Sequence, residues 1–325
     1  SRSFSLPKDL EVNFKFTLGS WEKVEKGGDG KEISNRKLIV TKDENVKLIV
    51  ENWEDNVKVE KRHTLTGNIK YHKNFYAKKL DNKRTIIVYL PPSYDKDAKK
   101  RYPVIYMHDG QNIFDTATSF IGVEWGVDET AEKLISQNKI KEIIAVGIYN
   151  NSDRVKEYTP FIDRERGGGT ADKYVDFIIH DLKPFIDKTY RTLPDRNNTA
   201  VMGSSLGGLV SLYIAWNYSE IFSMAGVVSP AIWWADYKIL DVIKKSKNKK
   251  DIKIYLDMGT KEGATGSLEK FNSAIVDARK LRDLLLNSGF VLNKNLKYFE
   301  DKDAIHNESA WAKRVHRPLL FFFSQ

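Results

Sequence analysis

A serine between two glycines is the part of this sequence best suited to chemistry. Gly203, Ser205 and Gly207 form a G-x-S-x-G pattern, which at a sharp turn from a strand into a helix exposes a serine hydroxyl for attack on an acyl carbon. The residues two positions before and two positions after such a serine approach one another and must be small. Ser204 does not satisfy this rule, because its corresponding neighbours are Met202 and Leu206. We expect Ser205 to be a nucleophile. The alternative is a glycine-rich turn without chemistry.

A serine hydroxyl needs a base to remove its proton. In folds with such a turn the chain order is nucleophile, acid, histidine, and of the six histidines only His306 and His316 follow Ser205. His306 lies between a strand-like stretch with an acidic turn and a helix that Asn307 would begin. His316 lies within or beyond that helix. We therefore predict that His306 is the base.

The acid that orients the base is expected in the loop after the strand that ends at Leu256. Asp257 and Glu262 are both candidates, because either could accept the second ring N–H of the histidine and stabilise the imidazolium. Asp257 still belongs to the strand, whereas Glu262 lies beyond a turn and can bend back toward His306. We favour Glu262 and leave Asp257 open.

Acyl transfer also needs hydrogen-bond donors for the oxyanion of the tetrahedral intermediate. One donor is expected to be the backbone N–H of Leu206, directly after the nucleophile. The second is expected in the loop after the strand at 102–107, where Gly110 lets the backbone turn inward and the Gln111 N–H is our choice. His108 precedes the nucleophile in the chain, so we expect it to brace this loop.

The elements that would position these residues alternate between strands and helices. This alternation predicts a mostly parallel sheet with helices on both faces, and catalytic groups at the carboxyl ends of its strands. The expected strands are 85–90, 102–107, 143–148, 200–202 and 252–256, and the expected helices are 127–137, 171–188, 206–218 and 270–287.

The first part of the chain has a different pattern. Short runs that alternate apolar and polar residues, at 11–17 and 46–50, are separated by turn residues such as 27–30. This pattern is typical of a small antiparallel β module. We therefore divide the chain into a β module at 1–62 and an α/β domain at 63–325.

Composition limits the function classes. The 325-residue chain is 41% hydrophobic and 30% charged, which is ordinary for a globular protein, and no apolar run is long enough to predict a membrane span. Without cysteine there is no disulfide, thiolate metal site or cysteine nucleophile. The net charge of +9 indicates a lysine-rich surface or, alternatively, attraction of an anionic substrate. The lysine cluster at 244–250 lacks interleaved aromatic residues, so we expect no nucleic-acid partner.

The location is less constrained. The first residues contain neither an initiator methionine nor an apolar signal core, so we expect that any export signal has already been removed. We favour an extracytoplasmic location, periplasmic or secreted, and leave a cytoplasmic one open. The sequence does not fix the oligomeric state.

Residues 66–325 resemble the putative-esterase family of α/β-hydrolases, which includes feruloyl and acetyl-xylan esterases and siderophore trilactone esterases. The matching segments, in chain order, are VYLPPSY (88–94), MHDGQNIFD (107–115), EYTP (157–160), GSSLGG (203–208), SPAIWW (229–234) and HNESAW (306–311). The resemblance implies an α/β-hydrolase fold and a triad of Ser205, His306 and Glu262. It supports Glu262 over Asp257, because the acid of the family follows a similar Gly-Thr turn, although many members carry Asp there.

Residues 11–37 resemble the last strands of a carbohydrate-binding-like β-sandwich. Together the two resemblances imply a serine carboxylic-ester hydrolase that works through an acyl-enzyme on feruloyl or acetyl esters of polysaccharide. The alternatives are a siderophore trilactone esterase, an acyltransferase with the same triad, and a non-enzymatic glycan-binding protein. No metal or organic cofactor is implied.

Four aromatic residues are expected near the top of the sheet, where they could contact an aryl acyl group or a sugar face. They are Trp125, Tyr158, Trp233 and Trp234. The alternative for each of them is a place in the core.

Overall fold

The architecture is centred on one eight-stranded sheet, seen in a computed structural model that describes residues 4–19, 23–53, 62–246, 250–263 and 273–325. Its strands, from one edge to the other, are β14 (Leu296–Asp301), β13 (Lys253–Gly259), β12 (Met224–Val228), β11 (Thr199–Ser204), β7 (Val104–His108), β8 (Ile144–Ile148), β6 (Asn82–Leu90) and β5 (Asn68–Ala77).

The sheet is parallel from β14 to β8; β6 runs opposite to these strands, and β5 pairs antiparallel with β6. The central strands β7, β8, β11 and β12 are buried at every position, because helices cover both faces and both sets of side chains are apolar. Because the six strands from β14 to β8 are parallel, their carboxyl ends all lie along the same side of the sheet, which we call its carboxyl edge. The predicted α/β-hydrolase fold is confirmed.

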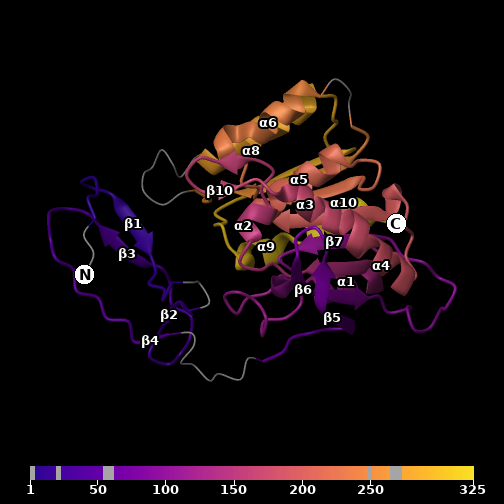
Figure 1. The fold of residues 1–325 in the computed structure, drawn as a ribbon, viewed down its shortest axis with the longest axis horizontal. Helices are drawn as coiled ribbons and strands as arrows, with labels where there is room; N and C mark the ends of the chain where they lie inside the picture. The colour runs from indigo at the N-terminus through magenta and orange to yellow at the C-terminus, as the bar shows by residue number, and fades with distance from the viewer. Residues whose placement is uncertain (1–3, 20–22, 54–61, 247–249, 264–272) are drawn as a thin grey trace.

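Alternate residues of the strands build two cores, one on each face of the sheet. One core contains side chains from α3, α4, α5, α6 and α8, and the other contains side chains from α1, α9 and α10; Figure 1 shows these helices around the sheet. Their bounds are α1 (Val127–Ser136), α3 (Ala171–Asp176), α4 (Lys183–Thr189), α5 (Leu206–Asn217), α6 (Trp234–Lys245), α8 (Ser273–Asn287), α9 (Glu308–Arg314) and α10 (His316–Phe323).

Some expected elements differ from the structure. Strands β5 and β12 were not predicted. The helix expected at 171–188 is divided into α3, a π-helical turn at Phe177–Leu182 and α4; Pro184 has no N–H for the regular ladder, which favours such a change of pitch. The first residues of the helix expected at 270–287 lie outside the described residues.

The N-terminal strands pair with one another and not with the large sheet. β1 (Glu11–Phe14) pairs with β3 (Arg36–Ile39), and β2 (Glu25–Lys26) with β4 (Asn52–Trp53), all antiparallel; Figure 1 draws them in indigo. The strand expected at 46–50 is wrong, because this segment has no ladder partner and its Ile49 is 79% exposed. The boundary at 62 stays a prediction, since residues 54–61 lie outside the described part.

In the described part of the chain, no helix has the length and apolar character needed to cross a bilayer.

A buried ion pair gives a test of this fold. Arg84 on β6 binds Glu157 with a shortest distance of 2.7 Å, and their side chains are 0% and 2% exposed. Arg84→Met would leave a buried carboxylate without its cation, which typically costs about 3–5 kcal/mol of unfolding free energy. We expect urea denaturation to show a loss of that size.

The matched control is Lys78→Met, which removes the 76% exposed lysine of the Lys78–Asp181 pair. Exposed pairs contribute about 0–1 kcal/mol, so this variant should unfold close to wild type. Equal losses for the two variants would contradict the structural role of the buried pair.

Candidate active site

Ser205 occupies a strained turn between β11 and α5. Its backbone has φ 59° and ψ −120°, a conformation that costs a non-glycine residue about 1–3 kcal/mol and is common at active sites. The Ser205 N–H donates to the Val228 carbonyl of the neighbouring strand at 3.0 Å, which anchors the turn. The hydroxyl therefore lies at the carboxyl edge of the sheet and at the N-terminus of a twelve-residue helix.

The close approach expected around Ser205 is present, but it restricts the two glycines unequally. A Cβ on Gly203 would lie 2.9 Å from the Gly207 carbonyl carbon and 2.9 Å from His108 Cδ2. A Cβ on Gly207 would meet only ordinary contacts, beginning with His108 Cβ at 3.4 Å. Gly203 is therefore the position that the turn needs as glycine.

His306 and Glu262 are brought together although 44 residues separate them. His306 Nδ1 lies 2.8 Å from Glu262 Oε2, and the edge-on ring of Trp311 lies against the imidazole at a centroid distance of 4.9 Å. The carboxylate is 1% exposed, whereas the His306 side chain is 43% exposed. Because Nδ1 is occupied by the carboxylate, Nε2 is the ring nitrogen left to act on a substrate or nucleophile.

The second oxygen of Glu262 is also fully bound. Glu262 Oε1 accepts hydrogen bonds from Ser229 Oγ at 2.7 Å, the Gly259 N–H at 2.8 Å and the Arg314 guanidinium at 3.0 Å. Burial by itself would raise the pKa of Glu262, but His306, Ser229 and Arg314 outweigh burial and hold that pKa below its ordinary value. The carboxylate is therefore ionised at neutral pH.

The other candidates of the sequence have different surroundings. Asp257 is fully buried and binds Arg314 and the Ser229 N–H, not His306. His108 is buried against Tyr174, and burial lowers the pKa of its imidazole to about 3, so it is neutral and braces the loop. His316 begins α10.

The loop after β7 contains the second residue expected to donate to an oxyanion. Gly110 and Gln111 lie in a short 3₁₀ turn, Gly110–Asn112, and a Cβ on Gly110 would collide with the backbone of Gly147 at 2.5 Å. Gln111, in this turn, and Leu206, the first residue of α5, are at positions whose backbone N–H groups have no partner within their own helix.

An ion pair that the sequence analysis missed supports this loop. Asp109 has a left-handed backbone conformation. Its carboxylate accepts hydrogen bonds from Arg154 Nε at 2.7 Å, from a second Arg154 nitrogen at 2.8 Å and from Asn150 Nδ2 at 2.5 Å. Burial would raise the pKa of Asp109, but Arg154 outweighs it and lowers that pKa. No local motif indicates Arg154 as the partner, because 45 residues separate the pair.

Ser205, Glu262 and His306 line one cavity of about 680 Å³. No direct Ser205–His306 hydrogen bond is formed in the described structure, and catalytic hydrogen bonds are often long before substrate binds. Other lining residues, which the sequence analysis did not single out, include Arg166, Ser229, Tyr237, Met258 and Asp277.

Of the four aromatic residues expected at the substrate, only Trp233 lines this cavity. It is 44% exposed, and the Arg166 guanidinium lies 5.3 Å from its ring centroid. Trp125, Tyr158 and Trp234 are at most 5% exposed, so the expectation that they contact substrate is wrong. Their side chains face the apolar cores, and position along the chain does not distinguish a wall of the site from a core residue.

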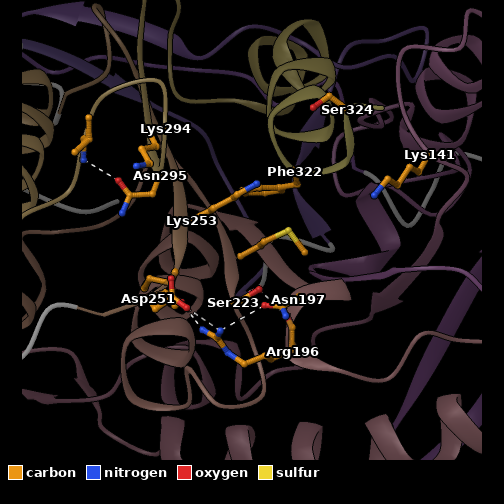
Figure 2. Close-up of a pocket in the computed structure, with 13 residues that line it drawn as sticks. Lys141, Arg196, Asn197, Ser223, Asp251, Lys253, Lys294, Asn295, Phe322 and Ser324 are labelled. Carbon is orange, nitrogen blue, oxygen red and sulfur yellow. Dashed lines mark hydrogen bonds and ion pairs between the residues drawn. The ribbon is translucent and has the colours of Figure 1, made fainter.

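A second cavity, of about 710 Å³, lies at the amino ends of the parallel strands, opposite the Ser205 cavity. Its lining includes Ser223, Lys253 and Asn295, at the amino ends of β12, β13 and β14. Figure 2 shows lysines around it and an Arg196 side chain that is already bound to Asp251. Catalytic groups of such sheets gather at the carboxyl ends, so this cavity is remote from the candidate site.

One carboxylate cluster has the spacing of a cation site. Single oxygens of Glu124, Asp128 and Glu129 lie within 4.8 Å of one another. Burial and the neighbouring Glu129 raise the pKa of Asp128 to about 9, so at neutral pH a proton can hold the two carboxyl groups together. The cluster does not line the cavity of Ser205.

The comparisons with known proteins show the family of this chain. The family model described as "Putative esterase" matches residues 77–322. The chain is 32% identical over 192 residues to Bacillus subtilis (strain 168) protein YjcH, covering 58% of this chain and 72% of that one.

Two similar proteins have named activities. One is the endo-1,4-beta-xylanase/feruloyl esterase of Xylanibacter ruminicola, 29% identical over 62% of this chain and 26% of its own length. The other is the ferri-bacillibactin esterase BesA of Bacillus subtilis, 27% identical over 57% of this chain and 66% of its own length. The crystal structure of the BES protein from Bacillus cereus has the same fold, with TM-score 0.62, 23% identity, and coverage of 83% and 100%.

The eight-stranded sheet and the serine turn at its carboxyl edge define an α/β-hydrolase. Within that class, the chain belongs to the putative esterase family, and it is a carboxylic ester hydrolase. This membership argues against the non-enzymatic alternative.

The unequal restriction of the two glycines can be tested. We expect Gly203→Ala to lose at least about 100-fold in kcat/KM for p-nitrophenyl acetate, because displacement near the reacting groups by about 1 Å can cost that much. Gly207→Ala, the matched control, should stay within about 10-fold of wild type, since its Cβ meets only ordinary contacts. Equal losses, with both variants folded by circular dichroism, would contradict the geometry.

Proposed function

We propose that Ser205, His306 and Glu262 form the catalytic triad of this esterase. The observation that supports it most is the 2.8 Å contact of His306 Nδ1 with the buried Glu262, on the wall of the cavity that Ser205 also lines. An anionic partner at Nδ1 fixes the tautomer in which Nε2 accepts a proton, and it stabilises the imidazolium.

The reaction follows in two halves. Ser205 Oγ attacks the ester carbonyl while His306 Nε2 removes the hydroxyl proton of Ser205. The Leu206 and Gln111 N–H groups donate hydrogen bonds to the oxyanion that forms. The tetrahedral intermediate collapses to an acyl-enzyme, and His306 returns the proton to the departing alcohol. Water, activated by the same nitrogen, then hydrolyses the acyl-enzyme and releases the acid.

We propose esters of polysaccharide, with feruloyl or acetyl groups, as the substrate class. The exposed ring of Trp233 on the cavity wall suits an aryl acyl group or a sugar face, and the Xylanibacter ruminicola relative is named a feruloyl esterase. A polysaccharide substrate lies outside the cell, so an extracytoplasmic location is part of this proposal. An acyltransferase would use the same residues, with an acceptor alcohol in place of water.

A second candidate, a siderophore trilactone, is favoured by Arg166. This arginine lines the cavity beside Trp233, and its side chain is 52% exposed while it pairs with Asp163 at 3.4 Å and Glu165 at 3.6 Å. A guanidinium at the mouth of the site attracts an anionic substrate such as a ferric catecholate, and BesA is named a ferri-bacillibactin esterase.

The substrate class is tested by parallel assays with methyl ferulate, acetylated xylan and a catecholate trilactone. We expect release of ferulate or acetate, and we expect Ser205→Ala to abolish it, since loss of a triad nucleophile costs at least about 10⁴-fold. Turnover of the trilactone alone would reject the polysaccharide assignment. Undiminished turnover by Ser205→Ala would reject the triad.

The role of Trp233 has its own test. Trp233→Ala should raise KM for methyl ferulate by about 2- to 13-fold, the effect of losing about 0.5–1.5 kcal/mol of aromatic contact, with a smaller change for p-nitrophenyl acetate. Tyr76→Ala, at a 46% exposed aromatic residue on the edge strand β5, is the control and should leave both KM values unchanged. An unchanged KM in Trp233→Ala would place the acyl group elsewhere.

A further inference from the structure

Behind Glu262 lies a second buried carboxylate that does not touch His306. We propose that Asp257 and Arg314 are a pair of positioning residues: Arg314 fixes the Glu262 carboxylate, and Asp257 balances the charge of Arg314 so that Glu262 keeps its negative charge for His306. This inference rests on the proposed triad and assigns a task to the acid that the triad leaves unused.

Arg314, on α9, connects the two carboxylates. It donates to Asp257 through Nε at 3.1 Å and a terminal nitrogen at 3.2 Å, and the same terminal nitrogen lies 3.0 Å from Glu262 Oε1. Ser229 Oγ accepts a hydrogen bond from that nitrogen at 2.6 Å and itself donates a hydrogen bond to Glu262. The Arg314 side chain is 3% exposed and both carboxylates are 0% exposed, so water screens none of these charges.

The charges explain why one cation is shared. If Arg314 faced Glu262 alone, the two charges would cancel, and Glu262 would stabilise the imidazolium of His306 weakly. Asp257 binds Arg314 in a two-bond contact, the stronger form of such pairing. Burial raises the pKa of Asp257, and the contact with Arg314 acts in the opposite direction and favours its charged form. The guanidinium can therefore orient Glu262 Oε1 while Oε2 faces His306 with its charge retained.

Other charged groups also surround His306. Glu308 is the first residue of α9, two residues after His306, and burial raises its pKa. The Asp109–Arg154 pair lies near Glu308. The Lys261–Asp303 pair flanks the loop, Asp301 binds Arg314 at 3.2 Å, and Arg166 and Asp277 line the cavity. All of them are retained in the variants below, so they cannot produce shifts of opposite sign.

The test is the pH dependence of kcat/KM for p-nitrophenyl acetate, whose acid limb reports the pKa of the free enzyme's base. Asp257→Asn removes a negative charge, disfavours the imidazolium and should move the acid limb to lower pH by roughly 0.5–1 unit. Arg314→Met removes a positive charge and should move the limb to higher pH. Arg314→Lys should restore the wild-type limb, and the double variant Asp257→Asn/Arg314→Met should lie near it.

Opposite shifts would support the proposal, and shifts of the same sign or an unmoved limb in both variants would overturn it. Should Arg314→Met fail to fold, Asp257→Asn decides alone, because its side chain is nearly isosteric: a lower limb supports the pair and an unmoved or higher limb overturns it. Titration of His306 by NMR should give the same sign. Ser205→Ala separates the two proposals, since activity that survives it would refute the triad itself, whereas unmoved limbs with an inactive Ser205→Ala would refute only the charge balance.

Discussion

The site depends on the close contact between backbone segments at the turn after β11. Ser205 adopts φ 59° because the strand must end and α5 must begin within one residue, and only the absence of a side chain at Gly203 lets the two segments meet. The Ser205 N–H bond to Val228 and the paired strands on either side hold this turn. The strain, about 1–3 kcal/mol, is small beside the burial of the surrounding cores.

Around this turn, the parallel sheet determines which residues can meet. The Glu262 loop follows β13, His306 follows β14 and the Gln111 loop follows β7. Because parallel strands end at the same edge, three loops far apart in sequence converge on Ser205. Two of these loops are also held by ionic contacts, Arg314 with Glu262 and Arg154 with Asp109 in the Gln111 loop.

Charge is arranged differently at the two ends of the Glu262–His306 pair. Glu262 is enclosed and receives four polar contacts, which keep it ionised, whereas the His306 side chain is 43% exposed. The imidazole is therefore the member of the pair that can exchange a proton with a ligand. Trp233 and Arg166 line the cavity, and in the proposed function these two residues and their neighbours select the substrate.

The sequence by itself determined the chemistry of the site to a large extent. A glycine, a serine and a second glycine between a strand and a helix are a local pattern, and the order of Ser205, Glu262 and His306 along the chain follows from how this fold is wound. The central strands could also be predicted, because strands buried on both faces are continuously apolar. The edge strand β5, with mixed polarity, carries a weaker signal and was missed. β12 was also missed, although it is as long as β7 and β8 and is buried at every position.

Only the tertiary structure shows which carboxylate contacts the histidine and which aromatic residues line the cavity. The turn in the sequence favours Glu262 and leaves Asp257 open, whereas the structure pairs Glu262 with His306 and Asp257 with Arg314, on a helix 52 residues beyond Glu262. Trp233 and Trp234 are adjacent, yet one is 44% and the other 3% exposed, because α6 begins between them and turns the second ring toward Phe161. Such choices depend on which side of a backbone faces a distant segment, and local composition carries no record of that.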